Sequence, residues 1–297
     1  MSALARPLNG ILNSLALPAG LLAAGTVLIA LQLGVPQIDF GQPAIGAPET
    51  VTLAPADFTY RAEGHFLRDG VPVDAPMIET RLDAPLVIMK YQVSAADYAS
   101  CVAHGACAPA EPRYPGHGNV PVTGVNYDDA TDYAAWLSLR TGQNWTLPTD
   151  RQWAFAAGSA FADDALALAE DDANPAIRWL ANYEKEAARE NDAGRIPLPL
   201  GSFGSNENGV ADMGSNVWEW TQTCHRRVHL DAAGNVLSET PACTIKVLDG
   251  QHRTPMTFFI RDAKSGGCSV GIPPDNLGFR LVREPAWHER LLALIGR

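Results

Sequence analysis

The chain has 297 residues, of which 46% are hydrophobic and 19% charged, the balance of an ordinary globular protein. Its formal charge is -11, which argues against a nucleic acid as partner, because phosphate backbones are bound by basic surfaces. The 26 glycines and 22 prolines favour a fold with many turns over a helical bundle.

An uncharged apolar stretch over residues 11–35 is long enough to cross a bilayer as one helix. Arg6 precedes it and the next basic residue is Arg61, so the positive-inside rule places residues 1–10 in the cytoplasm and exports the remainder. We therefore expect a single-pass anchor in a bacterial inner membrane, with a domain facing the periplasm. A cleaved signal peptide and a buried core helix are the alternatives.

Residues 36–57 are rich in Pro, Gly and Ala, which predicts a linker before the domain. Strand-like alternation begins at residues 58–61, and Gly64 and Gly70 divide the neighbouring sequence into short pieces. The compact apolar run over residues 86–89 predicts a buried strand.

Three helices come next, each marked by a capping residue. Ser94, with Asp97 three residues later, is the N-cap of the first. The second begins after Asn126, has apolar residues at helical spacing and stops at Gly142. Thr149 precedes the third, RQWAFAAGSA.

The segment 174–284 is dominated by Gly, Pro, Asn and Asp, so we expect it to be irregular and to need ions, disulfides or aromatic packing. Within it, strand alternation would send Trp218 and Trp220 to the face opposite Glu219, into the core. Residues 286–297 are expected to be a C-terminal tail.

The five cysteines suit an exported protein. Cys101 and Cys107 bracket a short loop, which predicts a local disulfide in an oxidising compartment. A metal pair is the alternative, although the spacing is not that of a zinc knuckle. Of Cys224, Cys243 and Cys268, at most two can pair with each other, and the sequence leaves the pairing open.

Oxygen-bearing side chains gather within fourteen residues among tight glycine turns, a pattern that suits calcium but also ordinary turns. They are Asn206, Asn208, Asp212, Asn216 and Glu219.

Two further features could carry chemistry. His225 and His229 lie four residues apart, but a strand-like segment precedes them, so we expect surface histidines and not a zinc pair on a helix. Cys268 comes after Lys264 and Arg261 in a glycine-rich loop, and nearby positive charge lowers the pKa of a thiol. Half of a structural disulfide is the alternative for Cys268.

Six segments at their mutual spacing resemble the formylglycine-generating enzyme family, also called sulfatase-modifying factor domains. They are YQVSAADYASCV, PVTGVNYDDATDYAAWLS, NWTLPTDRQWAFAA, LANYE, NENGVADMGSNVWEWT and DNLGFRLVR. The resemblance implies one domain over residues 58–285 with an α+β fold related to C-type lectins, loop-rich and with little regular secondary structure.

The resemblance also implies two structural calcium sites. One would use Asn182, the carbonyl of Tyr183, Asp192 and the carbonyl of Gly194. The other would use Asp212, the carbonyls of Ser215 and Val217, and Glu219.

Members of this family oxidise a cysteine of a protein substrate to formylglycine, with oxygen and a copper held by two cysteine thiolates. If Gly250 matches the first glycine of the family's Gly-Gly-Ser turn, His252 replaces the serine, and Pro255 and Ile260 stand at the two cysteine positions. Neither residue can bind copper, so the pair is absent or rebuilt.

The remaining catalytic candidates are Cys268 together with His252 or Arg253, and whether copper or iron is used stays open. We expect a maturation or modification factor that acts on a sulfatase-like or reductase-like protein of the cell envelope. It is most similar to an exported branch that includes accessory proteins of nitrite reductases. The alternative is an inactive binding module that presents a groove near Trp218 and Trp220 to a peptide or glycan.

Overall fold

The computed structural model describes residues 46–114, 116–165, 196–262 and 276–285, together with residues 177, 180, 181, 183 and 184. No helix in these ranges combines the length and the apolar character needed to cross a membrane. The predicted anchor over residues 11–35 and the predicted tail over residues 286–297 lie outside them.

The described strands are β1 (Thr50–Leu53), β2 (Asp57–Arg61), β3 (His65–Arg68), β4 (Val71–Val73), β5 (Met77–Arg81), β6 (Leu86–Met89), β7 (Asn144–Thr146), β8 (Trp218–Leu230), β9 (Val236–Asp249), β10 (Thr254–Thr257), β11 (Leu277–Gly278) and β12 (Val282–Glu284). The described helices are α2 (Ala95–Ala103), α3 (Tyr127–Thr141), α4 (Asp150–Ala157) and a short 3-10 helix, η1 (Gly158–Ala160).

The three predicted helices are confirmed, with their caps. The Ser94 hydroxyl accepts the Asp97 N–H at 3.0 Å, and the Asn126 side chain forms a capping box at the start of α3. Gly142 ends α3 in the left-handed region, at a φ of 67°. The Thr149 hydroxyl accepts the Gln152 N–H at 3.1 Å, and α4 then gives way to η1 earlier than predicted.

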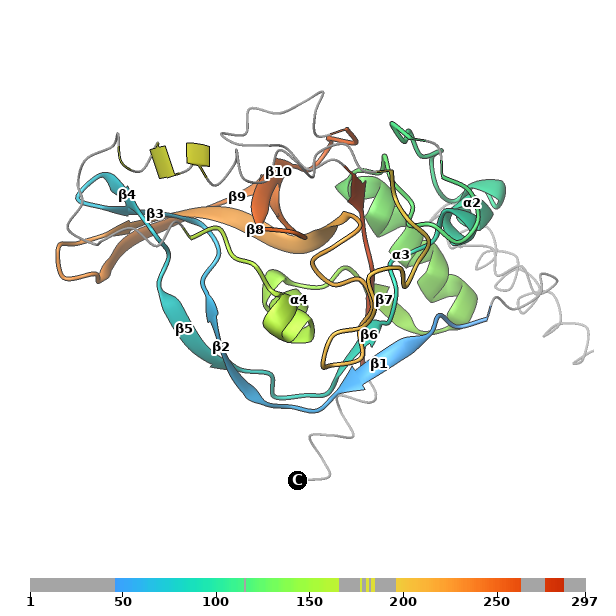
Figure 1. Cartoon of the computed structure of the whole chain (residues 1–297), viewed down its shortest axis with the longest axis horizontal. Coiled ribbons are helices and arrows are strands. Elements are labelled where there is room, and N and C mark those ends of the chain that lie inside the picture. The colour runs from blue at the N-terminus through green and yellow to red at the C-terminus, as the bar shows by residue number, and fades with distance from the viewer. Residues whose placement is uncertain are drawn as a thin grey trace, which may run out of the picture. The chain divides into compact units, whose positions relative to one another are not determined.

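The strands form three sheets. One has the order β1-β6-β12-β7, and a second has the order β10-β9-β8-β3-β4, with β11 also paired to β8. The third is the ribbon β2-β5. Helix α4 lies between this ribbon and the long strands β8 and β9, whereas α2 and α3 lie at one end of the domain (Figure 1). This mixture of sheets and few helices agrees with the expected α+β class.

Two expectations about the chain's organisation are wrong. Strand β1 falls inside the predicted linker and pairs with β6, with Thr50 opposite Met89, so the domain begins before residue 58. The segment expected to be irregular contains the two longest strands, β8 and β9, of 13 and 14 residues. Its Gly and Asn residues mark the turn at 231–235, while alternating residues such as Val228 and Leu230 supply the strand.

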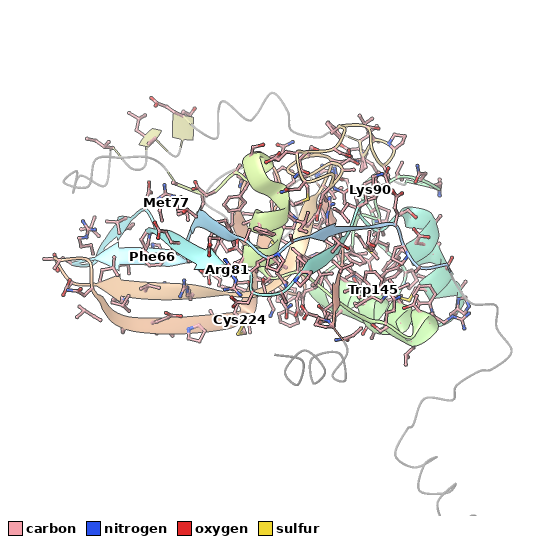
Figure 2. All side chains as sticks on the ribbon, turned by 90° about the horizontal axis from the view of Figure 1, so that it is seen from below. Phe66, Met77, Arg81, Lys90, Trp145 and Cys224 are labelled. Carbon is pink, nitrogen blue, oxygen red and sulfur yellow. A yellow bond between two sulfur atoms is a disulfide. The ribbon has the colours of Figure 1, made fainter. Side chains whose placement is uncertain are left out.

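Buried side chains form three clusters. One packs α2 and α3 against Trp220 and Phe279, and a second surrounds Trp153 on α4. The third includes Phe66 on β3. Phe66 lies at the opposite end of the domain from Trp145 (Figure 2). Trp218 is also buried, so the expectation that both tryptophans of the WEW stretch belong to the core is confirmed.

Two disulfides cross-link the domain. Cys101 pairs with Cys107 as predicted, and Cys224 on β8 pairs with Cys243 on β9. Four of the five cysteines are therefore used, which leaves Cys268, outside the described residues, as the fifth.

Glu219 and Arg280 form an ion pair at the centre of the domain, with 1% and 0% of their side chains exposed. Both guanidinium nitrogens that face the carboxylate donate to it, Nε at 2.6 Å and Nη2 at 2.7 Å. Gln92 and Trp153 each donate a further hydrogen bond at 2.9 Å. The remaining Arg280 donors reach the carbonyls of Lys90 and Ala211, so all charged atoms of the pair are compensated.

We expect Glu219→Gln to destabilise the domain by about 3–5 kcal/mol, because the substitution leaves the buried Arg280 charge without its partner. Denaturant titration of the purified chain measures this loss. The control is Asp57→Asn, which breaks the ion pair between Asp57 and Arg81. Because 78% of the Asp57 side chain is exposed, this substitution should change stability little. Equal losses in the two variants would contradict the central role of the Glu219 pair.

Candidate functional site

The predicted calcium site at Asp212 and Glu219 does not fit the structure. Both oxygens of Glu219 are taken by Arg280, whose positive charge would repel a calcium ion at the same place. The Asp212 carboxylate accepts the backbone N–H groups of Gly201 and Phe203, at 2.6 and 2.9 Å. The resemblance assigns the carboxylates of Glu219 and Asp212 to a calcium ion. In this structure Arg280 binds the Glu219 carboxylate, and backbone N–H groups bind that of Asp212.

The ion's other proposed ligands fit no better. The Ser215 carbonyl accepts the Val217 N–H at 2.8 Å within the same turn. In the first predicted site only Tyr183 belongs to the described residues, so the set with Asn182, Asp192 and Gly194 stays a prediction. Nowhere in the described ranges are three or more His, Cys, Asp or Glu residues arranged to hold a metal ion.

Two of the three catalytic candidates have structural roles. His252 is buried; its carbonyl accepts the Trp218 indole N–H at 3.0 Å, and its ring meets the Trp218 ring edge-on. Arg253 is buried in ion pairs with Asp150 and Asp164, so it is not available to a substrate. Cys268, the third candidate, lies outside the described residues.

The tryptophans of the WEW stretch cannot form a binding groove either. Trp220 is fully buried and donates its indole N–H to the Val125 carbonyl, and Trp218 is almost as deeply buried. The predicted peptide or glycan groove at these two residues is therefore wrong, since core side chains pack around both indole rings.

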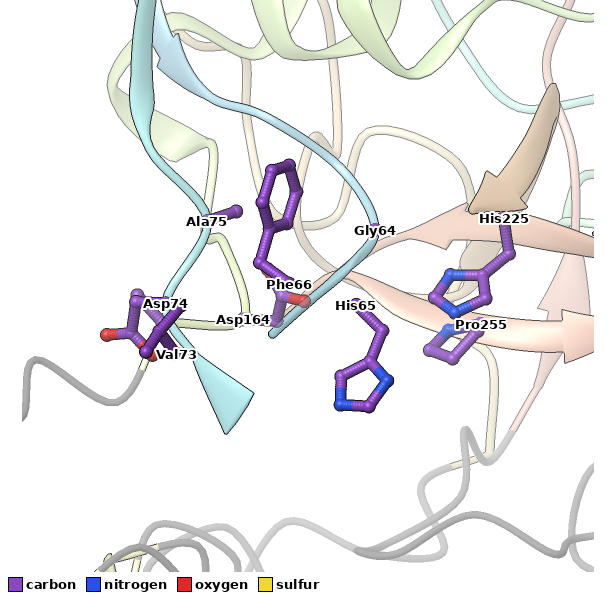
Figure 3. A pocket seen from close by; sticks show the side chains of 10 residues that line it. Gly64, His65, Phe66, Val73, Asp74, Ala75, Asp164, His225 and Pro255 are labelled. Atoms are coloured by element: carbon purple, nitrogen blue, oxygen red, sulfur yellow. The ribbon is translucent and has the colours of Figure 1, made fainter. Parts of the chain in front are cut away.

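A different site lies where β3, β4, β8 and β10 come together with the segment Asp163–Ala165. It is a pocket of about 230 Å³. Pro255, which the resemblance aligns with a copper cysteine, lines this pocket, whereas the second aligned residue, Ile260, packs against the core. Two imidazoles, of His65 and His225, face the same space beside Pro255 (Figure 3).

Gly64 and the strand register bring the two histidines together. Strand β3 runs parallel to β8 with His65 opposite Arg227, so His65 and His225 lie on the same face of the sheet, one diagonal step apart. Gly64 has a φ of 120°, and a Cβ there would lie 2.8 Å from the Arg226 side chain and 2.9 Å from its carbonyl oxygen. Only glycine permits this close start of β3 against β8.

The carboxylate of the pocket is held in place by arginines. Arg253 donates to Asp164 from Nη2 at 3.0 Å and to the backbone carbonyls of Arg61 and Ala62 at 2.9 Å. Arg61 in turn donates to the neighbouring Asp163 at 2.8 Å. These bonds fix the segment Asp163–Ala165 as one wall, while 42% of the Asp164 side chain remains exposed.

Burial and charge shift the titration of two groups at this site. The pKa of His225 is lowered, first by burial and then by repulsion from His65 and Arg227, with Asp164 opposing the shift. The pKa of Glu63, next to Gly64, is raised to about 7, mainly by burial, even though Arg226 donates to it at 2.9 Å. Burial therefore disfavours the charged form of both groups, the His225 imidazolium on β8 and the Glu63 carboxylate just before β3.

The imidazoles of His65 and His225 and the carboxylate of Asp164 line the pocket, where they can form hydrogen bonds with a polar group that enters it. The sequence interpretation of His225 as a surface histidine missed this, because the residue is half-buried and faces His65 from another strand. His65 and Asp164 had no sequence signal of their own. The glycine before His65 was the one available indication.

A family model described as the Sulfatase-modifying factor enzyme 1-like domain matches residues 39–285, most of the chain. A formylglycine-generating enzyme of Mycobacterium tuberculosis is 37% identical over 181 residues, which are 56% of this chain and 58% of the relative. One of Streptomyces coelicolor is 32% identical over 109 residues, covering 35% and 32% of the two chains.

An inactive C-alpha-formylglycine-generating enzyme 2 of Bos taurus is 29% identical, over 57% of this chain and 54% of its own. The chain thus spans less than two thirds of each of these curated relatives. Among solved structures, PvdO from Pseudomonas aeruginosa has the same fold, with a TM-score of 0.50 at 22% identity over 80% of this chain and 95% of PvdO.

Glu63 should make stability fall as the pH rises from about 4.5 to 7, because its raised pKa means that the folded state holds a proton there that the unfolded state releases. In Glu63→Gln that part of the pH dependence should vanish, so the variant gains stability relative to the wild type over this window. Thermal unfolding across the pH range tests this. Near pH 4, where Glu63 is protonated in both states, the difference should be smallest; a difference that does not change with pH would contradict the prediction.

Proposed function

The chain belongs to the sulfatase-modifying factor family, and on that premise we propose that it recognises a protein partner in the cell envelope without the family's copper chemistry. The pocket at His65, His225 and Asp164 is the place where we expect the partner to bind. The partner would be a sulfatase-like or reductase-like protein, as the family resemblance implies.

One observation carries this proposal: the two positions aligned with the copper cysteines hold Pro255 and Ile260. Pro255 is exposed on β10 and its side chain has no atom that can ligate a metal, and Ile260 packs against the core cluster of α3. The similarity to a relative named as inactive supports a member of this fold that binds without turnover.

Export is part of the proposal. Two disulfides suit an oxidising compartment such as the periplasm, and the apolar stretch over residues 11–35 would tether the domain to the inner membrane. Tethering keeps the domain near other envelope proteins, which raises the effective concentration of a membrane-bound or periplasmic partner.

The absence of copper chemistry is tested on the full chain, purified in detergent. We expect no stoichiometric copper or iron by elemental analysis, and no oxidation of a Cys-x-Pro-x-Arg peptide by mass spectrometry. One copper per chain, or a formylglycine product, would overturn the proposal.

Binding at the pocket is tested with a photo-crosslinking amino acid at position 65 of the full chain in cells. We expect a discrete adduct with an envelope protein, lost on Gly64→Ala, which moves β3 away from β8. The control position is Asp83, which is 86% exposed and lies outside the pocket. Adducts of equal yield from both positions would argue against a site at His65.

A modification factor is the second candidate. The two disulfides leave Cys268 as the one cysteine without a partner among the described pairs, so it is the group on which thiol chemistry would depend. Because His252 and Arg253 are committed to the core, Cys268 would act without them. Full function in cells after Cys268→Ser would end this alternative.

A further inference from the structure

Asp249 is a fully buried acid with no donor to satisfy it. It is the last residue of β9, none of its surface is exposed, and among the described residues neither carboxyl oxygen has a hydrogen-bond donor. In the sheet register it stands opposite Glu219, so both side chains point to the same face, towards α4.

Four charged groups face Asp249 from the elements packed around it. Glu219 comes from β8, Asp150 from α4, Asp164 from the segment before residue 166, and Arg253 from the turn after β9. Glu219 is already neutralised by Arg280. Three carboxyl groups therefore share the one remaining cation, Arg253.

The guanidinium of Arg253 has no donor left for Asp249. Its Nη1 donates to the Arg61 carbonyl and to Asp150, its Nη2 to the Ala62 carbonyl and to Asp164, and its Nε to Asp164. These contacts use all five N–H groups of an arginine. An ionised Asp249 would thus be a buried charge without a hydrogen bond, which is among the costliest arrangements in a protein interior.

We propose that Asp249 and Asp150 hold one proton between them at neutral pH, carried by Asp249 and donated to the Asp150 carboxylate. The side chains of Asp150 and Asp249 are close enough for a hydrogen bond, which requires that one of the two carboxyl groups be protonated. Burial, and next the negative charge of Asp150, raise the pKa of Asp249 well above its ordinary value, while Arg253 opposes this. Burial also raises the pKa of Asp150, against the attraction of Arg253.

The shared proton matters for the pocket, because it leaves Arg253 with two carboxylates to balance, one in the pair and one on the pocket wall. Loss of the proton at alkaline pH would add a third negative charge around the same guanidinium. The stability that this proton contributes is complete at acidic pH and is lost as the pH rises through the raised pKa of Asp249. This inference stands independently of what the pocket binds.

The experiment uses the full chain carrying Glu63→Gln, so that Glu63, whose pKa is raised to about 7, does not contribute. Calorimetric unfolding at about pH 7, in two buffers of different ionisation enthalpy, counts the protons released. We expect release of about one proton, lost when Asp249→Asn is added, because the unfolded Asp249 ionises. The matched control Asp57→Asn, at an exposed acid, should leave the count unchanged.

Three further outcomes decide the matter. Asp249→Asn should keep or raise the melting temperature at about pH 7, since an amide is neutral and can still donate to Asp150, whereas Asp150→Asn should lower it by removing a partner of Arg253. If Asp249→Asn does not fold, infrared spectroscopy of the Glu63→Gln chain tests the proposal instead. The folded chain should show a carboxylic-acid band that is absent in denaturant. An unchanged proton count, no such band, or a metal ion that Asp249→Asn removes would overturn the proposal.

Discussion

The ion pair between Glu219 and Arg280 is the contact on which the rest of the domain depends. It joins β8 to the chain just before β12, and through Gln92 and Trp153 it reaches the start of α2 and the middle of α4. A buried pair of this kind adds little net stability over an apolar pair, but breaking it is costly. The pair therefore makes one arrangement of these distant segments much lower in free energy than arrangements that would separate Glu219 from Arg280.

Arg253, nearer the pocket, is a second buried arginine that joins distant segments through ion pairs. This arginine links Asp150 on α4 to Asp164 on the pocket wall, and its backbone bonds hold the end of β2. The charge balance differs, however, because the Glu219 pair is closed and complete whereas Arg253 stands among more acids than it can satisfy. The interior is thus rigid at its centre and titratable beside the pocket.

Local signals predicted what local interactions determine. Ser94, Asn126 and Thr149 were identifiable as caps because a capping bond joins residues three apart in the sequence. The hairpin of β8 and β9 joins consecutive strands, and it was missed because Gly, Pro, Asn and Asp dominate the composition of the whole segment. The His65–His225 pocket was beyond prediction because a parallel pairing between strands far apart in the sequence brings the two histidines together.

At Glu219 the predicted calcium ion has a competitor within the protein. Carboxylates and turn carbonyls near Glu219 suit a cation, and the sequence cannot say whether that cation is an ion or the guanidinium of Arg280, which lies 61 residues away. The motifs that identify the family are therefore the residues of an internal clamp: Trp153, Glu219 and Arg280 build the fold whether or not copper is bound. Because fold and chemistry rest on different residues, the chain can keep the fold even though Pro255 stands where the resemblance implies a copper ligand.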